Sequence, residues 1–376
     1  MEQKDDILLS VCIPSYNRAE LVGYLVKQCL EIFPDEGVEI LVSDNASTDD
    51  TPDRLRAITD PRFRYVRHEE PVSGENYKHY SNLLMCMELG RGKWCMDLTD
   101  KDEFESIDWP RMEKLLREEN GVAIYKGEYR SREGDVLSPL PPRTFKGGEA
   151  DAYRFLIATS SYATNHIVRR DYLIKAMDQV EYKRNLSVIL TYVHVFVFSC
   201  CLQYGTLSPI EGMVIKRQLP AVGERTRKAY AYKMFDKDEP YWTHIHRVEQ
   251  QLEWIRFFKP LLTDPHEQIK LLNDLFIAGL NVITLYYEQI TSDPVPNIHL
   301  SRAGFLARDQ ARPPEYWHHF YWESYMRLAK EISTNYPKLS AVNEANFMAV
   351  YDHYEKFSQL IEERKEKMRA KNSGEG

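Results

Sequence analysis

Short apolar segments alternate with helical patterns along the first part of the chain. Leu21, Leu25, Cys29 and Phe33 recur at near-helical spacing after the first apolar segment, and a further helix is predicted at residues 75–89. Strands are predicted at residues 7–13, 38–43, 63–67, 93–98 and 122–129, and a final strand at 213–217. This alternation predicts an α/β fold, with a mostly parallel sheet, right-handed crossovers and helices on the faces of the sheet.

The pattern changes at about residue 225. Beyond this point the segments with helical spacing are Tyr241 to Phe258, His266 to Ile290, Glu315 to Ile332 and Asn343 to Met368. A chain of 376 residues is also too long for one typical core. We therefore expect two domains, an α/β domain over residues 1–224 and an all-helical C-terminal domain over residues 225–376.

One apolar stretch, from Leu186 to Tyr204, carries no formal charge. Its length is sufficient to span a bilayer. Polar residues interrupt it, however, among them Ser187, His194 and Gln203. We expect a buried helix here, and a membrane span is the alternative.

Composition narrows the class of protein. The apolar and charged fractions are those of a soluble globular protein, and the formal net charge of -8 argues against a general nucleic-acid binder. The six cysteines form no CxxC pair and lie mostly in apolar segments, as free thiols do in a reducing cytoplasm. The N-terminal residues are acidic and lack the apolar run of a secretory signal. These features predict a cytoplasmic location.

Polar side chains gather where the predicted strands end. In an open parallel sheet, ligands bind at the carboxyl ends of the strands. The residues that close or follow the first, second and fourth strands are Pro14, Tyr16, Arg18, Asp44, Asp100 and Asp102. An aromatic ring, a cation and several carboxylates at one edge favour a nucleotide diphosphate held through a metal ion.

Three of these segments carry a family resemblance. The sequences SVCIPSYNR, EILVSDNASTDDT and GKWCMDLTDKDEF resemble the first strand, the second strand and the strand before the Asp-x-Asp motif of family 2 glycosyltransferases. The resemblance implies the GT-A (Rossmann-like) fold, and it is specific over about residues 7–105 and weaker over 106–220. Within the family, the chain is most similar to bacterial abequosyltransferase-like enzymes, which build surface polysaccharides.

The resemblance implies a metal site in the acidic turn. Asp102 corresponds to the ligand of Mg²⁺ or Mn²⁺, and Asp100 to the partner of the ribose or of a metal-bound water. Carboxylate oxygens are hard ligands that suit these ions. The alternative is an ordinary acidic surface turn. Asp97 and Thr99 compete for the first position of the motif, and Lys101 lowers the negative charge where many relatives have an acid.

The resemblance also assigns residues to the nucleotide donor. Asp44 corresponds to the acceptor of a hydrogen bond from the base. Beside it, we expect Tyr16 to stack on the base or to cover it, and Arg18 to reach the phosphates. Asn76 lies in a glycine-containing loop whose backbone amides face the sugar or the diphosphate. The structural alternatives are turn capping for Asp44, an exposed helix position for Arg18 and a helix N-cap for Asn76.

The catalytic base is the point where the chain departs from the family. Many inverting relatives carry an Asp on a helix about ninety residues after the metal motif, but the corresponding stretch here contains His194 and no carboxylate. His194 is therefore the candidate base, phosphate contact or metal ligand. The alternative is a satisfied core histidine. Glu181 and Glu211 flank the helix as substitute bases.

Two later segments complete the candidates. Arg217, Arg225 and Arg227 lie in a basic segment that resembles the mobile donor-covering loop of relatives, and a solvated connector is the alternative. The aromatic run from Tyr316 to Trp322 suits an interface, a lipid-facing patch or an acceptor site, and helix packing is the favoured alternative.

Together these features predict a metal-dependent, inverting glycosyltransferase that moves a sugar from a nucleotide-sugar donor to a glycan or lipid-linked glycan acceptor. Peripheral contact with the inner face of the membrane and self-association through the C-terminal helices are further expectations. Two alternatives remain at this level. A catalytically silent glycan- or nucleotide-binding scaffold fits the departures at Lys101 and at the base position. A nucleotidyltransferase lacks support, because no glycine-rich, lysine-containing loop follows the first strand.

Overall fold

The computed structural model describes residues 7–34, 36–72, 82–118, 120–160, 164–179, 193–217, 244–291, 309–337 and 341–373. The chain divides into two compact units, Met1–Phe235 and Asp236–Gly376. The division falls among residues outside the described ranges, so the predicted boundary at 224/225 stays a prediction.

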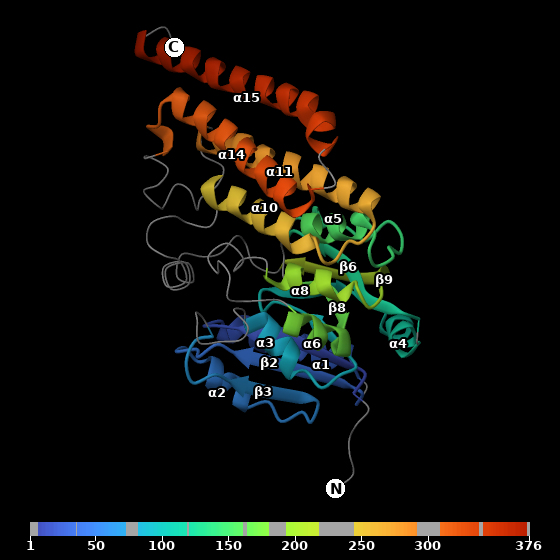
Figure 1. Ribbon diagram of the computed structural model, residues 1–376. Helices are drawn as coiled ribbons and strands as arrows, with labels where there is room; N and C mark the ends of the chain where they lie inside the picture. Colours follow the sequence, from blue (N-terminus) through green and yellow to red (C-terminus); the bar gives the residue numbers. More distant parts are fainter. Residues whose placement is uncertain are drawn as a thin grey trace. The chain divides into compact units, whose positions relative to one another are not determined.

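The first unit contains one nine-stranded sheet in its described residues (Figure 1), with the order β3-β2-β1-β4-β8-β6-β9-β5 and β7 paired to β6. The strands are β1 (Leu9–Ser15), β2 (Val38–Asp44), β3 (Phe63–Arg67), β4 (Trp94–Asp97), β5 (Asp102–Ser106), β6 (Val122–Arg130), β7 (Val136–Ser138), β8 (His166–Arg169) and β9 (Thr206–Arg217).

The sheet is mixed, and the expectation of a mostly parallel sheet needs this correction. β1 is parallel to β2 and to β4, and β2 is parallel to β3, as the strand–helix alternation predicts. Beyond β4 the strand directions are mixed: β8 is antiparallel to both β4 and β6, β6 is parallel to β9, and β5 is antiparallel to β9. The result is a GT-A-like α/β architecture whose parallel part supplies the edge where the candidate residues gather.

Helices cover both faces of the sheet. One face carries α1 (Ala19–Ile32), α2 (Thr51–Arg56) and α4 (Trp109–Arg117), whose apolar side chains share a core cluster with β1, β2 and β4. Phe33 packs edge-on against Trp109 at 5.0 Å between ring centroids, and the Trp94 indole donates a hydrogen bond of 2.8 Å to the Leu116 carbonyl. This packing fixes the strand that leads into the acidic turn.

The other helices of the first unit are α3 (Asn82–Leu89), α5 (Ala150–Thr159), α6 (Arg170–Gln179) and α8 (Val193–Cys201). α3 packs against β1 and β2, while α6 joins α3 to α8. All nine residues of α8 are buried, so this part of the apolar stretch is the buried helix that the sequence predicts. Residues 186–192 of that stretch lie outside the described ranges.

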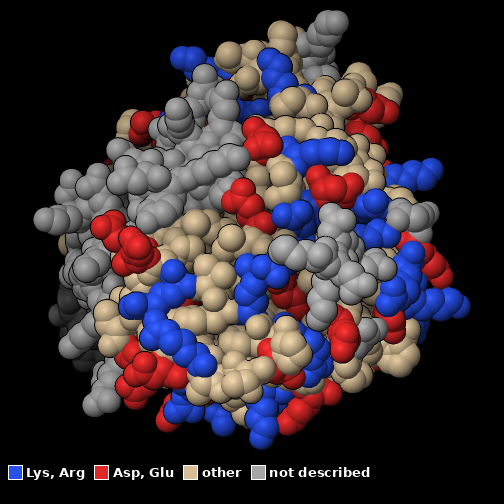
Figure 2. Space-filling view, turned by 90° about the horizontal axis from the view of Figure 1, so that it is seen from below, with Lys and Arg blue, Asp and Glu red and all other residues tan. Residues whose placement is uncertain are grey.

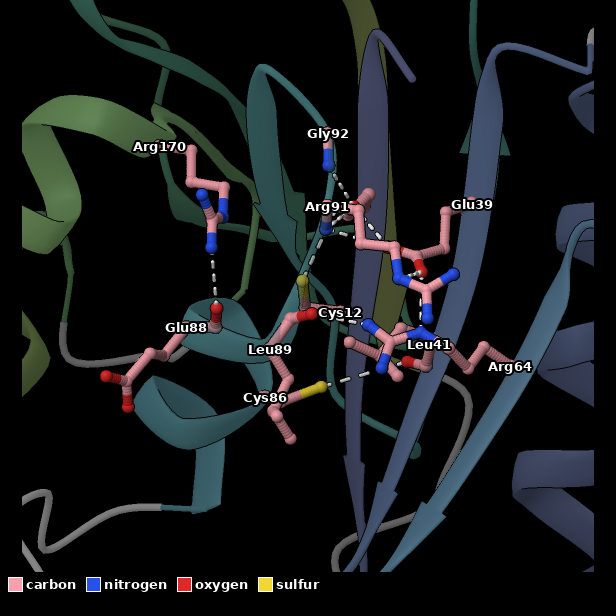
Figure 3. A network of polar contacts seen from close by, with 11 residues as sticks. Cys12, Glu39, Leu41, Arg64, Cys86, Glu88, Leu89, Arg91, Gly92 and Arg170 are labelled. Carbon is pink, nitrogen blue, oxygen red and sulfur yellow. Dashed lines mark hydrogen bonds and ion pairs between the residues drawn. The ribbon is translucent and has the colours of Figure 1, made fainter. Parts of the chain in front are cut away.

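A buried carboxylate stabilises the opposite end of the strands, away from the candidate site. Glu39 accepts hydrogen bonds from the Ser10 hydroxyl at 2.6 Å, from the Arg91 amide at 3.0 Å and from the Arg64 guanidinium at 2.6 Å (Figure 3). The amide of Gly92 in turn donates to the Ser10 hydroxyl at 2.8 Å. This cluster joins β1, β2 and β3 to the turn before β4.

The second unit is helical throughout its described residues, as predicted. Its helices are α10 (His244–Phe258), α11 (Pro265–Thr291), α14 (Pro314–Asn335) and α15 (Ala341–Ser373). Within the aromatic run, Trp317, Phe320 and Tyr321 are buried, and Trp317 packs against Tyr287. The packing alternative therefore holds for these three side chains.

Of the described helices, α11 has the length and apolar composition that crossing a membrane would need. A core helix of a soluble protein meets the same criterion, and residues such as Leu271, Leu280 and Ile283 of α11 are buried inside the second unit. Figure 2 shows one face of the molecule, on which acidic and basic side chains are interspersed rather than gathered into a field of one sign.

Candidate functional site

The carboxyl ends of β1 and β2 lie side by side, and the turns that follow them are bound together. Ser15 lies opposite Asp44 in the register of the two strands. The Asn17 amide donates to the Ser47 hydroxyl at 2.9 Å, and the Thr48 amide donates to the Asn17 side chain at 2.7 Å. Asn17 adopts a left-handed φ of 51°, which asparagine tolerates better than most residues. These contacts hold the two turns as one rim.

Pro14 and Tyr16 occupy this rim as predicted from the sequence, but in slightly different positions. Pro14 lies within β1 and does not end it. On the side of β4, the pairing of β1 ends at Cys12, so Pro14, which lacks an N–H, lies beyond the last residue that pairs with β4. Tyr16 is half-buried directly after the strand. Contact of either residue with a nucleotide stays a prediction.

Asp100 is neutralised by the first strand and the helix that follows it. Its Oδ2 accepts a hydrogen bond of 2.9 Å from the Ser15 hydroxyl, and its Oδ1 forms an ion pair of 2.5 Å with Arg18. Asp100 is 1% exposed, whereas the Arg18 side chain is 22% exposed. Two residues predicted at this edge are thus in direct contact, and the Arg18 side chain remains partly exposed.

Asp102 begins β5 and is held from two directions. The Tyr129 hydroxyl of β6 donates to its Oδ1 at 2.9 Å, and the Thr99 hydroxyl donates to its Oδ2. Burial raises the pKa of Asp102 to about 6, against the opposing effects of Thr99, Lys101 and Tyr129. Across the β5–β9 pair, Asp102 lies opposite Arg217. The turn therefore brings an incompletely compensated carboxylate next to the end of β9.

Lys101 lies among the charged residues of the turn. Burial lowers its pKa, while the charges of Asp102 and Asp100 raise it and those of Arg18 and Arg217 lower it further. The Nε of Arg217 is buried and has no hydrogen-bond partner among the described residues. Three cations and two carboxylates thus gather at one edge of the sheet, which is the composition expected around a bound phosphate group.

The fit to a divalent metal rests on Asp102 rather than on both acids. Mg²⁺ is commonly bound by one or two carboxylates together with substrate phosphates. Each Asp102 oxygen accepts one hydroxyl and has a second lone pair, and burial deprives the carboxylate of solvation by water. Asp100 already has Arg18 as its cation. The described residues contain no group of three or more His, Cys, Asp or Glu that would hold an ion alone, so a diphosphate would have to complete the site.

Asp97, which competed for the first position of the motif, is bound inside the fold instead. It is fully buried, and both its oxygens accept hydrogen bonds from His166, at 2.6 Å from the backbone amide and at 2.8 Å from Nδ1. The strand alternation sends Asp97 to the other face of the sheet from Trp94 and Met96. Asp100 and Asp102 are the acids at the edge.

Asp44 is the capping residue of its turn. Its Oδ1 accepts from the Ser47 amide at 2.9 Å, and its Oδ2 accepts from the Tyr65 hydroxyl at 2.6 Å and lies 3.5 Å from Arg67. Burial and the Asp44 carboxylate both raise the pKa of Tyr65. The structural alternative is confirmed for Asp44, and contact with a base stays a prediction. Tyr65 and Arg67 are partners that the sequence pattern did not indicate.

His194 is buried on α8, with 4% of its surface exposed. Its Nε2 lies 2.7 Å from the Ser160 carbonyl oxygen, and its ring contacts Phe198 edge-on. Burial lowers its pKa to about 4, which keeps the ring neutral at physiological pH. His194 is therefore well packed, and its role as base stays a prediction.

The substitute bases and the remaining basic residues fall elsewhere. Glu211 on β9 is exposed and forms an ion pair of 2.6 Å with Arg111. Asn76, Glu181, Arg225 and Arg227 lie outside the described residues. The part of the predicted site that the structure describes consists of Pro14, Tyr16, Arg18, Asp44, Asp100, Asp102, His194 and Arg217.

Residues 10–176 match the model of the family described as Glycosyl transferase family 2. The match runs from β1 to α6 and includes Asp44, Asp100 and Asp102, but ends before His194 and Arg217. No curated protein matches the chain in sequence. The match shows a likeness to this family over less than half of the chain, and the abequosyltransferase-like subtype stays a prediction.

Among solved structures, the chain is similar to a mannosyltransferase from Pyrobaculum calidifontis in complex with GDP-Man and Mn²⁺, at 16% identity over 87% of this chain and 86% of that chain, with a TM-score of 0.41. It is also similar to the mannosyl-3-phosphoglycerate synthase from Rubrobacter xylanophilus, at 15% identity over 69% of this chain and 78% of that chain, with a TM-score of 0.37. At these values the function proposed below rests on the family match and on the residues of this chain.

Proposed function

We propose that this protein is a glycosyltransferase that binds the diphosphate of a nucleotide-sugar donor at the carboxyl edge of β1, β2 and β4. The observation that carries the proposal is the gathering of Arg18, Asp100, Lys101, Asp102 and Arg217 at that edge. A diphosphate brings the negative charge that these three cations accept, and the family match supplies the reaction class.

Each residue then has a distinct task. Arg18, held by Asp100, and Arg217, whose Nε lacks a partner among the described residues, donate hydrogen bonds to the diphosphate and stabilise the charge that develops on it as the leaving group. Asp102 would hold Mg²⁺ or Mn²⁺, and the bound ion would supply Lewis-acid stabilisation of the same leaving group. Tyr16 and Asp44 lie on the rim where the base of the nucleotide would bind.

We further propose that an acceptor hydroxyl attacks the anomeric carbon with inversion, and that His194 receives the hydroxyl proton. The ring is neutral, as a base requires. A pKa of about 4 makes it a weak base, so the bound acceptor would have to raise that pKa by changing the charges around the ring. A glycan or lipid-linked glycan as the acceptor, a role in bacterial surface polysaccharide synthesis and a cytoplasmic location beside the membrane complete the proposal.

Calorimetric titration with UDP, GDP and CDP, each with and without Mn²⁺, tests the binding site. Asp102→Ala should weaken metal-dependent binding of the preferred nucleotide at least about tenfold, which corresponds to about 1.4 kcal/mol. Glu211→Gln is the matched control, because Glu211 is an exposed acid on the neighbouring strand β9. Equal affinity in the Asp102→Ala variant and in the parent protein would refute the metal assignment.

The silent-scaffold alternative is favoured by one observation, which is that His194 is only 4% exposed and that this burial lowers its pKa to about 4. Release of nucleoside diphosphate from UDP-, GDP- and CDP-linked sugars separates the two functions. An enzyme should release the diphosphate slowly with water as the acceptor. Nucleotide binding with no release, and with no transfer to any glycan tested, would favour the scaffold.

A further inference from the structure

A buried chain of polar contacts connects His194 to β4. His194 Nε2 lies 2.7 Å from the Ser160 carbonyl oxygen, the Ser160 hydroxyl lies 2.8 Å from His166 Nε2, and His166 Nδ1 lies 2.8 Å from Asp97 Oδ2. Ser160, His166 and Asp97 are fully buried. The four residues come from α8, the end of α5, β8 and β4, so the chain joins four separate elements of the fold.

The chemistry of the acceptors fixes the direction of the two outer hydrogen bonds. The Asp97 carboxylate only accepts, so His166 Nδ1 carries a proton and donates it. The Ser160 hydroxyl and His166 Nε2 share a hydrogen bond of 2.8 Å. The Ser160 carbonyl also only accepts, so His194 Nε2 carries the proton in that contact. The lone pair of the neutral His194 ring is therefore on Nδ1.

The same contacts link this chain to the acidic turn. Asp97 is the last residue of β4 and stands three positions before Asp100. Its carboxylate also accepts from the His166 backbone amide at 2.6 Å, and its carbonyl accepts from the Asn165 amide at 3.3 Å. Asp97 thus binds the start of β8 to the end of β4 by both backbone and side chain. The position of Ser160, and with it that of His194, depends on the strand that leads into the donor site.

We propose that Asp97, His166 and Ser160 are positioning residues for sugar transfer. They hold the Nε2–H of His194 on the Ser160 carbonyl, so that Nδ1 is the atom that accepts the proton of the attacking hydroxyl. The proton leaves the acceptor oxygen as the bond to the anomeric carbon forms, the bond to the diphosphate breaks, and the imidazolium returns the proton to solvent. This inference rests on the proposed function and names the reacting atom within it.

The experiment measures donor binding and turnover separately in Asp97→Asn, His166→Gln, Ser160→Ala and His194→Gln. The probe is the nucleotide sugar that binds the parent protein most tightly in a panel of UDP-, GDP- and CDP-linked sugars. We expect His194→Gln to lower kcat by about 10²- to 10⁴-fold. The three positioning variants should lower kcat by roughly 10- to 100-fold, as outer partners of catalytic groups do, with the affinity for the donor within twofold of the parent.

His244→Gln is the matched control. His244 is also a fully buried histidine, bonded to the Tyr316 hydroxyl at 2.9 Å, but it belongs to the helical unit. Its replacement should lower the melting temperature and leave kcat unchanged. A second readout is the ¹⁵N spectrum of labelled histidines, in which His194 should show the Nε2–H tautomer in the parent and a mixture of tautomers in His166→Gln. The spectrum also shows whether each variant is folded.

The outcomes separate the inference from the function beneath it. Turnover within a few-fold of the parent in folded His194→Gln would overturn the inference while leaving the glycosyltransferase intact. An Nδ1–H tautomer of His194 in the parent would do the same. Loss of donor affinity in the positioning variants would show that they support the donor site and not the base. A parent protein that neither binds nor cleaves any donor would instead refute the proposed function.

Discussion

Burial of Asp102 makes a prediction about stability that is opposite to intuition. Asp102 is 1% exposed, and burial raises its pKa from 3.8 to about 6. The folded protein therefore holds a proton on this residue more tightly than the unfolded chain does. The stabilising effect of that proton is fully present below about pH 4 and is lost as the pH rises through about 6. At pH 8 the ionised carboxylate should destabilise the fold.

The size of the effect follows from the pKa. A rise from 3.8 to about 6, at about 1.4 kcal/mol per pKa unit, corresponds to about 3 kcal/mol of stability lost at pH 8. Asp102→Asn keeps the shape of the side chain and removes the ionisation. In the presence of a chelator, the variant should be more stable than the parent at pH 8 by up to about 3 kcal/mol, and the difference should shrink towards pH 4.

Thermal melts of both proteins between pH 4 and 8 provide the assay, because the difference between variant and parent cancels the titration of other groups. Asp60→Asn is the control of opposite sign, since the hydrogen bonds from Arg62 lower the pKa of Asp60. That stabilisation is present at neutral pH and is lost as the pH falls. Addition of Mn²⁺ with nucleotide should stabilise the parent and not Asp102→Asn. A parent that is more stable than Asp102→Asn at pH 8 in chelator would refute the reasoning.

Three further predictions follow from buried groups. Burial lowers the pKa of Lys126 from 10.5 to about 7, so the parent protein should become more stable as the pH rises from 7 to 10.5. The stability that Lys126→Met gains over the parent should therefore fall by roughly 3–4 kcal/mol from pH 7 to 10 in urea titrations. A difference that stays constant with pH would contradict this. A Cβ on Gly92 would stand 2.5 Å from the Ser10 amide nitrogen, so Gly92→Ala should lower the stability of the fold by about 2 kcal/mol or more. A Cβ on Gly121 meets no atom within 4 Å, but the φ of 69° is strained for alanine, so Gly121→Ala should lower the stability by about 1 kcal/mol. Equal melting temperatures of the two variants would count against the close approach at Gly92. Asp44→Asn should reduce the discrimination among UDP, GDP and CDP without changing the dependence on metal, and unchanged selectivity in titration calorimetry would exclude contact with the base.

The parallel half of the fold could be predicted because its signals are local. The segment 63–67 was expected as a strand and is β3, and the four C-terminal helices were expected within a few residues of their ends. β5 was missed because its sequence, Asp102–Ser106, is short and acidic, with Phe104 as its one apolar residue. It is a strand because β9 pairs with it, which is a contact across more than a hundred residues. β9 was expected only at 213–217, since Pro209 and Gly212 indicate turns in isolation.

The site divides in the same way. Arg18, Asp44, Asp100 and Asp102 follow strand ends, so the pattern of strands was enough to bring them to one edge. The side chains that contact these residues and affect their ionisation could not be predicted from the sequence. Tyr129 lies on β6, which β9 separates from β5 in the sheet, and no local pattern distinguishes it from the other tyrosines of the chain. Asp97 and His166 pair across 69 residues, a separation at which a sequence pattern indicates composition but not contact.

The mixed sheet has a consequence for how the donor site assembles during folding. Asp100 and Asp102 are two residues apart, yet Asp100 depends on Ser15, 85 residues earlier, while Asp102 lies opposite Arg217 at the end of the last strand. Such long-range contacts form slowly, because the entropy of closing each loop must be overcome first. The Asp100 half can form once β1 and β4 have paired, but the Asp102 half must wait for β9. A nascent chain that has not yet reached residue 217 would therefore carry the full acidic motif and only half of its site.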